Sequence, residues 1–323
     1  MSETEPALSV ILTSRAGWAP VRRTLDYLAA QTVAERIELV LVLLDGRPPD
    51  GEPPDSVRKL AAHRCVPAPE ARSVAQANTA GVRHARAPVV ALGEDHAFPE
   101  PGWAEALLAR HAGPWAVVGP QVRNANPDSL VSWADFVLSY GPFATGTPGG
   151  EAEAAAGHNS SYKRAVLDRQ GGGLEDALAA EWVFHGRLRA EGDGVFVEPR
   201  AVVAHVNFSK LRPFLFHAFR GGRAGAASRA LRWPGARRLV YTAGCVLLPA
   251  LRLARLSRAL PREQRRGVPA LALPLMLAGL VVDAAGQAAG FATGNPAHVH
   301  GDLLDFEVER VRYVSAADAS TLW

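Results

Sequence analysis

The chain has 323 residues, of which 48% are hydrophobic and 21% are charged, and its formal net charge is +3. This composition is that of a folded protein and excludes an intrinsically disordered chain. Because no basic stripe interleaved with aromatic residues and no recognition motif is present, nucleic acid is not an expected partner.

The N-terminal part of the chain predicts a strand–helix–strand unit. The first ten residues lack the basic and apolar regions of a signal peptide, so we expect this part to lie in the cytoplasm. Apolar runs rich in β-forming residues occupy residues 8–13 and 37–44, and Val21, Leu25 and Leu28 recur between them at helical spacing. Strand, helix and strand in this order form the βαβ unit of a parallel sheet.

The same pattern continues along the chain. Further strands are expected near residues 64–66, 88–92, 115–119, 195–197 and 201–206, and further helices over residues 73–84, 103–111 and 176–190. The predicted fold class is α/β, with a Rossmann-like, mostly parallel sheet flanked by helices. We assign this domain to residues 1–210.

Residues 211–323 predict a helical, apolar module. Its apolar stretches, residues 239–251 and 268–294, are short or interrupted for a spanning helix, which needs ~20 apolar residues. If both crossed a bilayer, the arginine-rich segment between them would lie outside, against the positive-inside rule. We therefore expect membrane-associated helices on the cytoplasmic face of the membrane, with arginines toward anionic head groups. A buried helical hairpin and a dimer interface are the alternatives.

Several segments, in this order, resemble those of family 2 glycosyltransferases over residues 7–210. They read LSVILTSR, ELVLVLLDG, AQANTAGVRHA, VVALGEDHAFPEPGW, GHNSSYKRAVL and GGGLEDALAAEWVFHGRLRAEG. The resemblance implies a GT-A fold, a nucleoside-diphosphate sugar as donor, a hydroxyl acceptor, and Mg²⁺ or Mn²⁺ as cofactor.

Two acids, Glu94 and Asp95, follow the predicted strand over residues 88–92. A divalent cation stabilises the charge of a leaving diphosphate, and hard cations take carboxylate and phosphate oxygens. The resemblance implies that Asp95 binds the metal and that Glu94 faces the ribose or the donor sugar, while His96 replaces a third acid of the family. His205 is a second candidate metal ligand, and a structural histidine is the alternative. For the acids, the alternative is a solvated turn.

Four residues are predicted to bind the nucleotide. Asp45 ends the second strand, and the resemblance implies that it binds the base; an Asp-Gly turn without a ligand is the alternative. Thr13 and Arg15 lie on the same rim, where the carboxyl ends of strands bind ligands. Asn78 either lines the nucleotide pocket or bonds to backbone groups within a helix.

An inverting transfer needs a carboxylate that takes the proton of the acceptor hydroxyl. The family places this base in a Glu-Asp pair, where the present chain has Glu181 followed by Trp182. We expect Glu181 to be the base, with Glu175 and Asp176 as the alternative pair. An exposed Glu–His pair four residues apart is the non-catalytic alternative for Glu181.

Trp182 has two interpretations. On one continuous helix it shares a face with Leu174 and Leu178, at a spacing of four residues. It is therefore expected either to pack in the core or to stack on the acceptor as part of the substrate site.

Together these patterns predict an inverting, metal-dependent glycosyltransferase that uses a uridine, thymidine or guanosine diphospho-sugar. A lipid-linked acceptor or a cell envelope polysaccharide fits the apolar module. A catalytically inactive GT-A protein that binds a nucleotide sugar is the alternative, because Glu94, His96 and Trp182 replace acids of the family. A nucleotidyltransferase would need a Gly-rich, Arg-bearing loop after the first strand, which residues 14–18 do not supply.

Overall fold

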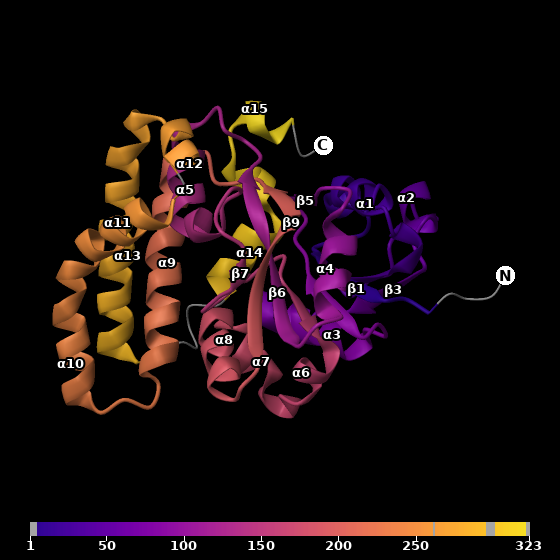
Figure 1. The fold of residues 1–323 in the computed structure, drawn as a ribbon, viewed down its shortest axis with the longest axis horizontal. Helices are drawn as coiled ribbons and strands as arrows, with labels where there is room; N and C mark the ends of the chain where they lie inside the picture. The colour runs from indigo at the N-terminus through magenta and orange to yellow at the C-terminus, as the bar shows by residue number, and fades with distance from the viewer. Residues whose placement is uncertain (1–4, 261, 295–300, 321–323) are drawn as a thin grey trace. The chain divides into compact units, whose positions relative to one another are not determined.

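The computed structural model describes residues 5–260, 262–294 and 301–320. The chain divides into two compact units (Figure 1). Residues 5–123 and 148–205 belong to the first, and residues 124–147 and 206–320 belong to the second. The domains predicted from the sequence, residues 1–210 and 211–323, stay a prediction.

A mixed sheet forms the centre of the first unit. Its strands within the described residues are β1 (Leu8–Ser14), β2 (Ile37–Leu43), β3 (Ala62–Pro67), β4 (Val89–Leu92), β5 (Ala97–Pro99), β6 (Trp115–Asn124), β7 (Gly150–Glu151), β8 (Ser161–Lys163) and β9 (Gly194–His205). Their spatial order is β3-β2-β1-β4-β8-β6-β9-β5, and β7 pairs with β9. The first four strands of this order are parallel, whereas β8, β5 and β7 pair antiparallel with their neighbours. The chain therefore reverses its direction of winding between β1 and β4, where open α/β sheets bind ligands.

Both faces of the parallel strands are buried. All seven residues of β1 and all seven of β2 are buried, which is typical of strands covered by helices on both sides. Side chains alternate across the sheet, so Ile11 packs in the core with α3 (Val74–His84), whereas Val10 and Leu12 pack in the core with α1 (Arg22–Ala29) and α4 (Trp103–His111). The shorter helices of this unit are α2 (Asp55–Arg58), α6 (Arg164–Asp168), α7 (Leu174–Leu178) and α8 (Glu181–Ala190).

The predicted α/β fold is confirmed, two local predictions were wrong, and short strands were missed. Residues 195–197 and 201–206 belong to one strand, β9. The helix expected over residues 176–190 is two helices, because Ala180 has non-helical angles (φ −147°, ψ 65°). The short strands β5 and β8 were not predicted, since three residues carry too little periodicity to be recognised.

The second unit consists of helices. They are α5 (Leu130–Tyr140), α9 (Leu211–Ala230), α10 (Gly235–Gly244), α11 (Leu248–Ala259), α12 (Arg262–Gly267), α13 (Leu273–Thr293), α14 (Gly301–Val308) and α15 (Ala316–Ala319). Helix α13 packs against α9, α5, α10 and α11, and Figure 1 shows α9, α10, α11 and α13 side by side in orange and yellow. The predicted C-terminal helical module is therefore present.

Small residues let α9 and α13 approach closely. A Cβ atom on Gly286 would collide with the carbonyl oxygen of Phe219, and one on Gly290 would collide with that of Arg223. Because glycine has no side chain, the two helix backbones can lie against each other. This packing makes α13 the central helix of the second unit.

Two helical stretches of the described chain are long and apolar enough to cross a membrane, judged by length and composition alone. They are residues 235–258 and 270–293, and a buried core helix of a soluble protein can pass the same test. The first stretch has few buried residues, and Val246 in it is 79% exposed. Contiguous exposed apolar residues of this kind mark an interaction surface.

Candidate active site

Three ligand-type side chains meet at the carboxyl edge of the sheet in the first unit. Glu94 and His96 follow β4, and His205 ends β9, whose pairing with β5 sets Ala97 opposite His205. The Nε2 atoms of His96 and His205 lie 3.7 and 3.5 Å from the Glu94 carboxylate, and all three residues are buried. One ligand atom from each lies within 4.8 Å of the others, close enough together to hold a metal ion. We call these residues the Glu94 cluster.

Asp95 contacts this cluster through a histidine. Its Oδ1 lies 2.6 Å from Nδ1 of His96, which leaves Nε2 of the same ring toward Glu94. A carboxylate that holds one ring nitrogen fixes the tautomer and the orientation of a ligating histidine. The residue grouped with the two histidines is thus Glu94, whereas the sequence had indicated Asp95. The ligand role of Asp95 stays a prediction, as does that of His205.

The donor set fits a divalent transition metal. One carboxylate and two imidazoles are offered, and imidazole suits transition metals, whereas Mg²⁺ prefers oxygen ligands. Which of the two cofactors expected, Mg²⁺ or Mn²⁺, binds these side chains stays a prediction.

Asn159 and His158 were not predicted as site residues. The Nδ2 of Asn159 donates to Glu94 Oε2 at 2.7 Å, and its backbone N–H donates to Leu92 O at 2.6 Å. Asn159 has a φ of +68°, and no other non-glycine residue of the described chain has a positive φ. Nδ1 of His158 lies 3.8 Å from Glu94 Oε1. Backbone strain of ~1–3 kcal/mol persists where the surroundings hold it, typically at functional sites, and here it aims an amide at the Glu94 carboxylate.

Glu181, the predicted base, is the first residue of α8 and ends a chain of hydrogen bonds. The Tyr162 hydroxyl donates to Glu181 Oε1 at 3.0 Å, and Nε2 of His185 lies 2.9 Å from that hydroxyl. The backbone N–H of Ala155 donates to Nδ1 of His185 at 3.3 Å. Since Nδ1 accepts, Nε2 carries the proton and donates to Tyr162, whose single proton then goes to Glu181. Every donor in this chain of hydrogen bonds therefore points toward the Glu181 carboxylate.

The electrostatics of this network agree with that assignment. Burial lowers the pKa of His185 to about 4, so its ring is neutral at pH 7. Burial raises the pKa of the Glu181 carboxyl above its ordinary value, while His158 and the Tyr162 hydrogen bond act in the opposite direction. A raised pKa suits a general base that works near neutral pH. The alternative of an exposed Glu181–His185 pair was wrong, because His185 is fully buried.

The other predicted residues on this side of the site are exposed. Glu175 and Asp176 lie on the exposed face of α7, and Glu175 accepts a hydrogen bond from Gln76 at 3.0 Å. Trp182 is 48% exposed. The face that it was expected to share with Leu174 and Leu178 is not formed, since the break at Ala180 separates the two helices.

The predicted nucleotide-binding residues lie on neighbouring elements. Thr13 is buried near the end of β1, Arg15 follows the same strand, and Asp45 is exposed after β2. Because β1 and β2 are parallel, with Ser14 opposite Leu43, these positions share the edge that carries Glu94. Asp45 accepts a hydrogen bond from its own turn, from Arg47 N at 3.0 Å, and Asn78 is buried on α3. Their roles in binding stay predictions.

Comparisons with known proteins show the fold and the family of this chain. No curated protein matches the chain. A mannosyltransferase from Pyrobaculum calidifontis, PcManGT, solved in complex with GDP-Man and Mn²⁺, is similar in structure with a TM-score of 0.51 and 20% identity, over 88% of this chain and 87% of that chain. At this identity the likeness shows the GT-A fold. The model of the family described as glycosyl transferase family 2 matches residues 9–171, half of the chain. The chain therefore belongs to glycosyl transferase family 2.

Proposed function

We propose that this chain is an inverting, metal-dependent glycosyltransferase that moves a sugar from a nucleoside-diphosphate sugar to a hydroxyl acceptor. The observation that carries the proposal is the Glu94 cluster at the carboxyl edge of the sheet, in a member of this family. The similar mannosyltransferase was solved with GDP-Man and Mn²⁺, so this donor and this metal are the first to test. Uridine and thymidine diphospho-sugars are the other donor classes.

The Glu94 cluster would hold the cation, which supplies positive charge beside the diphosphate that leaves. Asp95 orients the ring of His96, and Asn159 fixes the carboxylate of Glu94 through its amide. These hydrogen bonds hold the side chains that would bind the metal in place before the donor binds.

Glu181 is the base of the proposed transfer. The acceptor oxygen forms a bond to the anomeric carbon while its proton passes to a Glu181 carboxylate oxygen. The bond from the anomeric carbon to the phosphate oxygen breaks on the opposite face, and the nucleoside diphosphate leaves with the electron pair. A single displacement of this kind inverts the anomeric configuration. The network of Tyr162 and His185 holds the carboxylate in position.

Release of nucleoside diphosphate from a panel of sugar nucleotides tests the proposal. Assays contain Mn²⁺, with water or a membrane lipid extract as acceptor. Glu181→Gln should bind donor like the wild type and turn over ~100-fold more slowly, whereas Glu94→Gln should lose Mn²⁺-dependent donor binding. Glu175→Gln and Asp176→Asn, on the exposed face of α7, are the matched controls. Donor binding without turnover under every condition would favour the inactive, sugar-nucleotide-binding protein instead.

We propose further that the helical unit attaches the protein to the cytoplasmic face of a membrane, where a lipid-linked acceptor for a cell envelope polysaccharide would lie. The support is the exposed apolar surface of α10 and of the turn that follows it, with Leu239 on the helix and Val246 and Leu247 in the turn among the exposed residues. Arginines in the same unit add ~1 kcal/mol each of attraction to anionic head groups.

Co-sedimentation with anionic liposomes tests this attachment. Replacing Val246 and Leu247 by Asp should abolish binding, while Leu231→Asp, a control outside the apolar stretches that is as exposed as Leu247, should not. High salt should weaken the binding without removing it, because buried apolar area remains. If release from the membrane requires detergent at every salt concentration, the helices span the bilayer. A wild-type protein that does not bind liposomes would refute the membrane proposal.

A further inference from the structure

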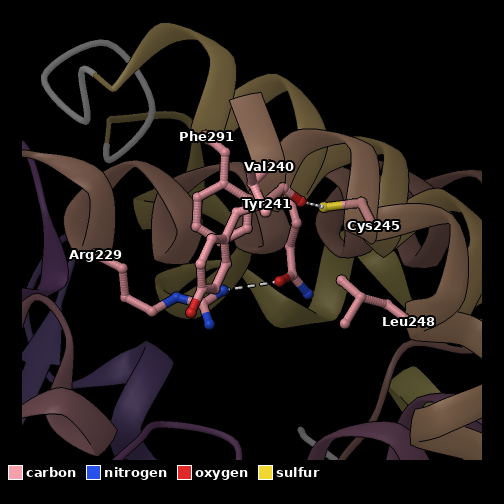
Figure 2. A pocket seen from close by; sticks show the side chains of 8 residues that line it. Arg229, Val240, Tyr241, Cys245, Leu248 and Phe291 are labelled. Atoms are coloured by element: carbon pink, nitrogen blue, oxygen red, sulfur yellow. Dashed lines mark hydrogen bonds between the residues drawn. The ribbon is translucent and has the colours of Figure 1, made fainter. Parts of the chain in front are cut away.

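The helical unit contains a pocket of about 300 Å³ between its helices (Figure 2). The lining residues come from α9, α10, the turn that follows it, α11 and α13: Arg229, Val240, Tyr241, Gly244, Cys245, Leu248, Gln287 and Phe291. All of them belong to the second unit. This volume lies at the lower end of the range of small-molecule sites, ~300–1,000 Å³.

The walls of the pocket are mostly apolar. The rings of Tyr241 and Phe291 lie 5.5 Å apart, and Val240 and Leu248 complete the surface. Trp233 supports both rings from outside the lining, with centroids 5.6 Å from Phe291 and 4.6 Å from Tyr241. Rings held in this way form a fixed apolar wall, against which a hydrocarbon chain can pack.

One positive charge lies inside this apolar surface. Among the described residues that line the pocket, Arg229 alone is charged, and Figure 2 shows its guanidinium directed toward the rings. Its Nη2 donates to Gln287 Oε1 at 2.8 Å, and its guanidinium carbon lies 4.9 Å from the Phe291 centroid. Burial lowers the pKa of Arg229, although a guanidinium stays charged in proteins.

The neighbouring charges leave an excess of positive charge. Asp283, on α13, pairs with Arg252 and accepts a hydrogen bond from Gln287 at 2.8 Å. Arg229, Arg252 and Asp283 thus comprise two guanidinium groups and one carboxylate. An anion beside Arg229 would offset the cost of holding this charge in apolar surroundings.

The rim of the pocket is also apolar. Val240, which lines it, is 68% exposed, and its neighbour Leu239 is exposed as well. The two ends of an amphiphilic ligand would therefore lie in different places. Its charged end would lie inside the pocket, and its hydrocarbon chain would pass out over the exposed surface of α10.

We propose that this pocket binds a single-chain amphiphile whose anionic head group, a phosphate or a carboxylate, meets Arg229 and whose hydrocarbon chain lies between Tyr241, Leu248 and Phe291. Binding here requires neither the Glu94 cluster nor glycosyl transfer. Failure of the proposed activity would therefore leave this inference standing, and the reverse also holds.

Calorimetric titration of the full-length chain with dodecyl phosphate, below its micelle concentration, tests the inference. Dodecanoate carries the other head group, dodecanol has the chain without the charge, and inorganic phosphate has the charge without the chain. Gly244→Leu fills the pocket, because a Cβ on Gly244 would meet no atom within 4 Å, and Gly235→Leu is its equally open control on the same helix. Arg229→Met removes the charge, and Arg255→Met removes an exposed arginine outside the pocket.

Wild-type protein should bind dodecyl phosphate or dodecanoate at one site, and the tighter of the two identifies the head group. Arg229→Met should weaken this binding ~10-fold or more without changing the affinity for dodecanol. Gly244→Leu should abolish it, while both control variants should bind like the wild type. Equal binding by Gly244→Leu and Gly235→Leu would overturn the inference. So would equal losses in Arg229→Met and Arg255→Met, or inorganic phosphate that binds as tightly as dodecyl phosphate.

Discussion

Tyr162→Phe should move the acid limb of the pH–rate profile to higher pH. The Tyr162 hydroxyl donates to the Glu181 carboxylate at 3.0 Å and so stabilises its ionised form. A hydrogen bond to a charged group contributes ~1.5–3 kcal/mol and one between neutral groups ~1 kcal/mol, so the preference for the carboxylate is ~0.5–2 kcal/mol. Since ~1.4 kcal/mol corresponds to one pH unit, the midpoint of the limb should rise by ~1 pH unit.

The assay is nucleoside diphosphate release, measured against pH for wild type, Tyr162→Phe and a control. Tyr27→Phe is that control, because it also removes a phenol hydroxyl from the first unit, where the Tyr27 ring stacks on Phe98 at 5.1 Å. Tyr162→Phe also leaves the Nε2 proton of His185 without its acceptor, so it should lose ~1–3 kcal/mol of stability. A variant that is less stable but keeps the wild-type midpoint would refute the role assigned to Tyr162.

Three further predictions concern the same site. Asn159→Ala should be less stable in chemical denaturation than Asn159→Gly by ~1 kcal/mol, because both lose the amide but only alanine opposes a φ of +68°; equal stabilities would contradict the strain. Asp95→Asn should weaken Mn²⁺ binding ~10–100-fold, as expected for a group that acts through a ligand, and Glu94→Gln should weaken it more. Both affinities are measured by calorimetry, and a larger loss in Asp95→Asn than in Glu94→Gln would identify Asp95 as the ligand. Because the folded pKa of Glu181 is raised, the ionised carboxylate disfavours the folded state as pH rises from the ordinary glutamate pKa through the raised value. Glu181→Gln should therefore melt above the wild type at neutral pH and lose this advantage below the ordinary glutamate pKa, and an advantage that is constant with pH would argue against a raised pKa.

The parallel part of the sheet was predictable from the sequence because its strands are long and apolar. β1 and β2 are buried on both faces, so most of their residues are apolar, and α1 between them has a regular apolar stripe. The antiparallel strands β5 and β8 have three residues each and are held by their neighbours. Local sequence carries no signal of such pairing, which depends on tertiary contacts.

The sequence allowed the place of the candidate site in the sheet to be predicted, but not the directions of its side chains. The acids after β4 were expected at the edge of the sheet, yet the directions of Glu94 and Asp95 depend on the turn that leads into β5 and on the hydrogen bond from Asn159. Asn159 itself gave one weak signal, because asparagine tolerates positive φ better than other side chains do. The helix break before Glu181 gave none, since Ala179 and Ala180 are residues that favour helices.

We propose that Glu94, His96 and His205 bind the metal that holds the donor. Anomalous diffraction at the manganese edge, from crystals grown with Mn²⁺ and GDP-mannose, would locate this metal. We predict one strong anomalous peak bounded by these three side chains, with the diphosphate of the nucleotide beside it. A peak ligated by Asp95 with Glu94 turned away, or no peak at this edge of the sheet, would show that the Glu94 cluster does not bind the metal.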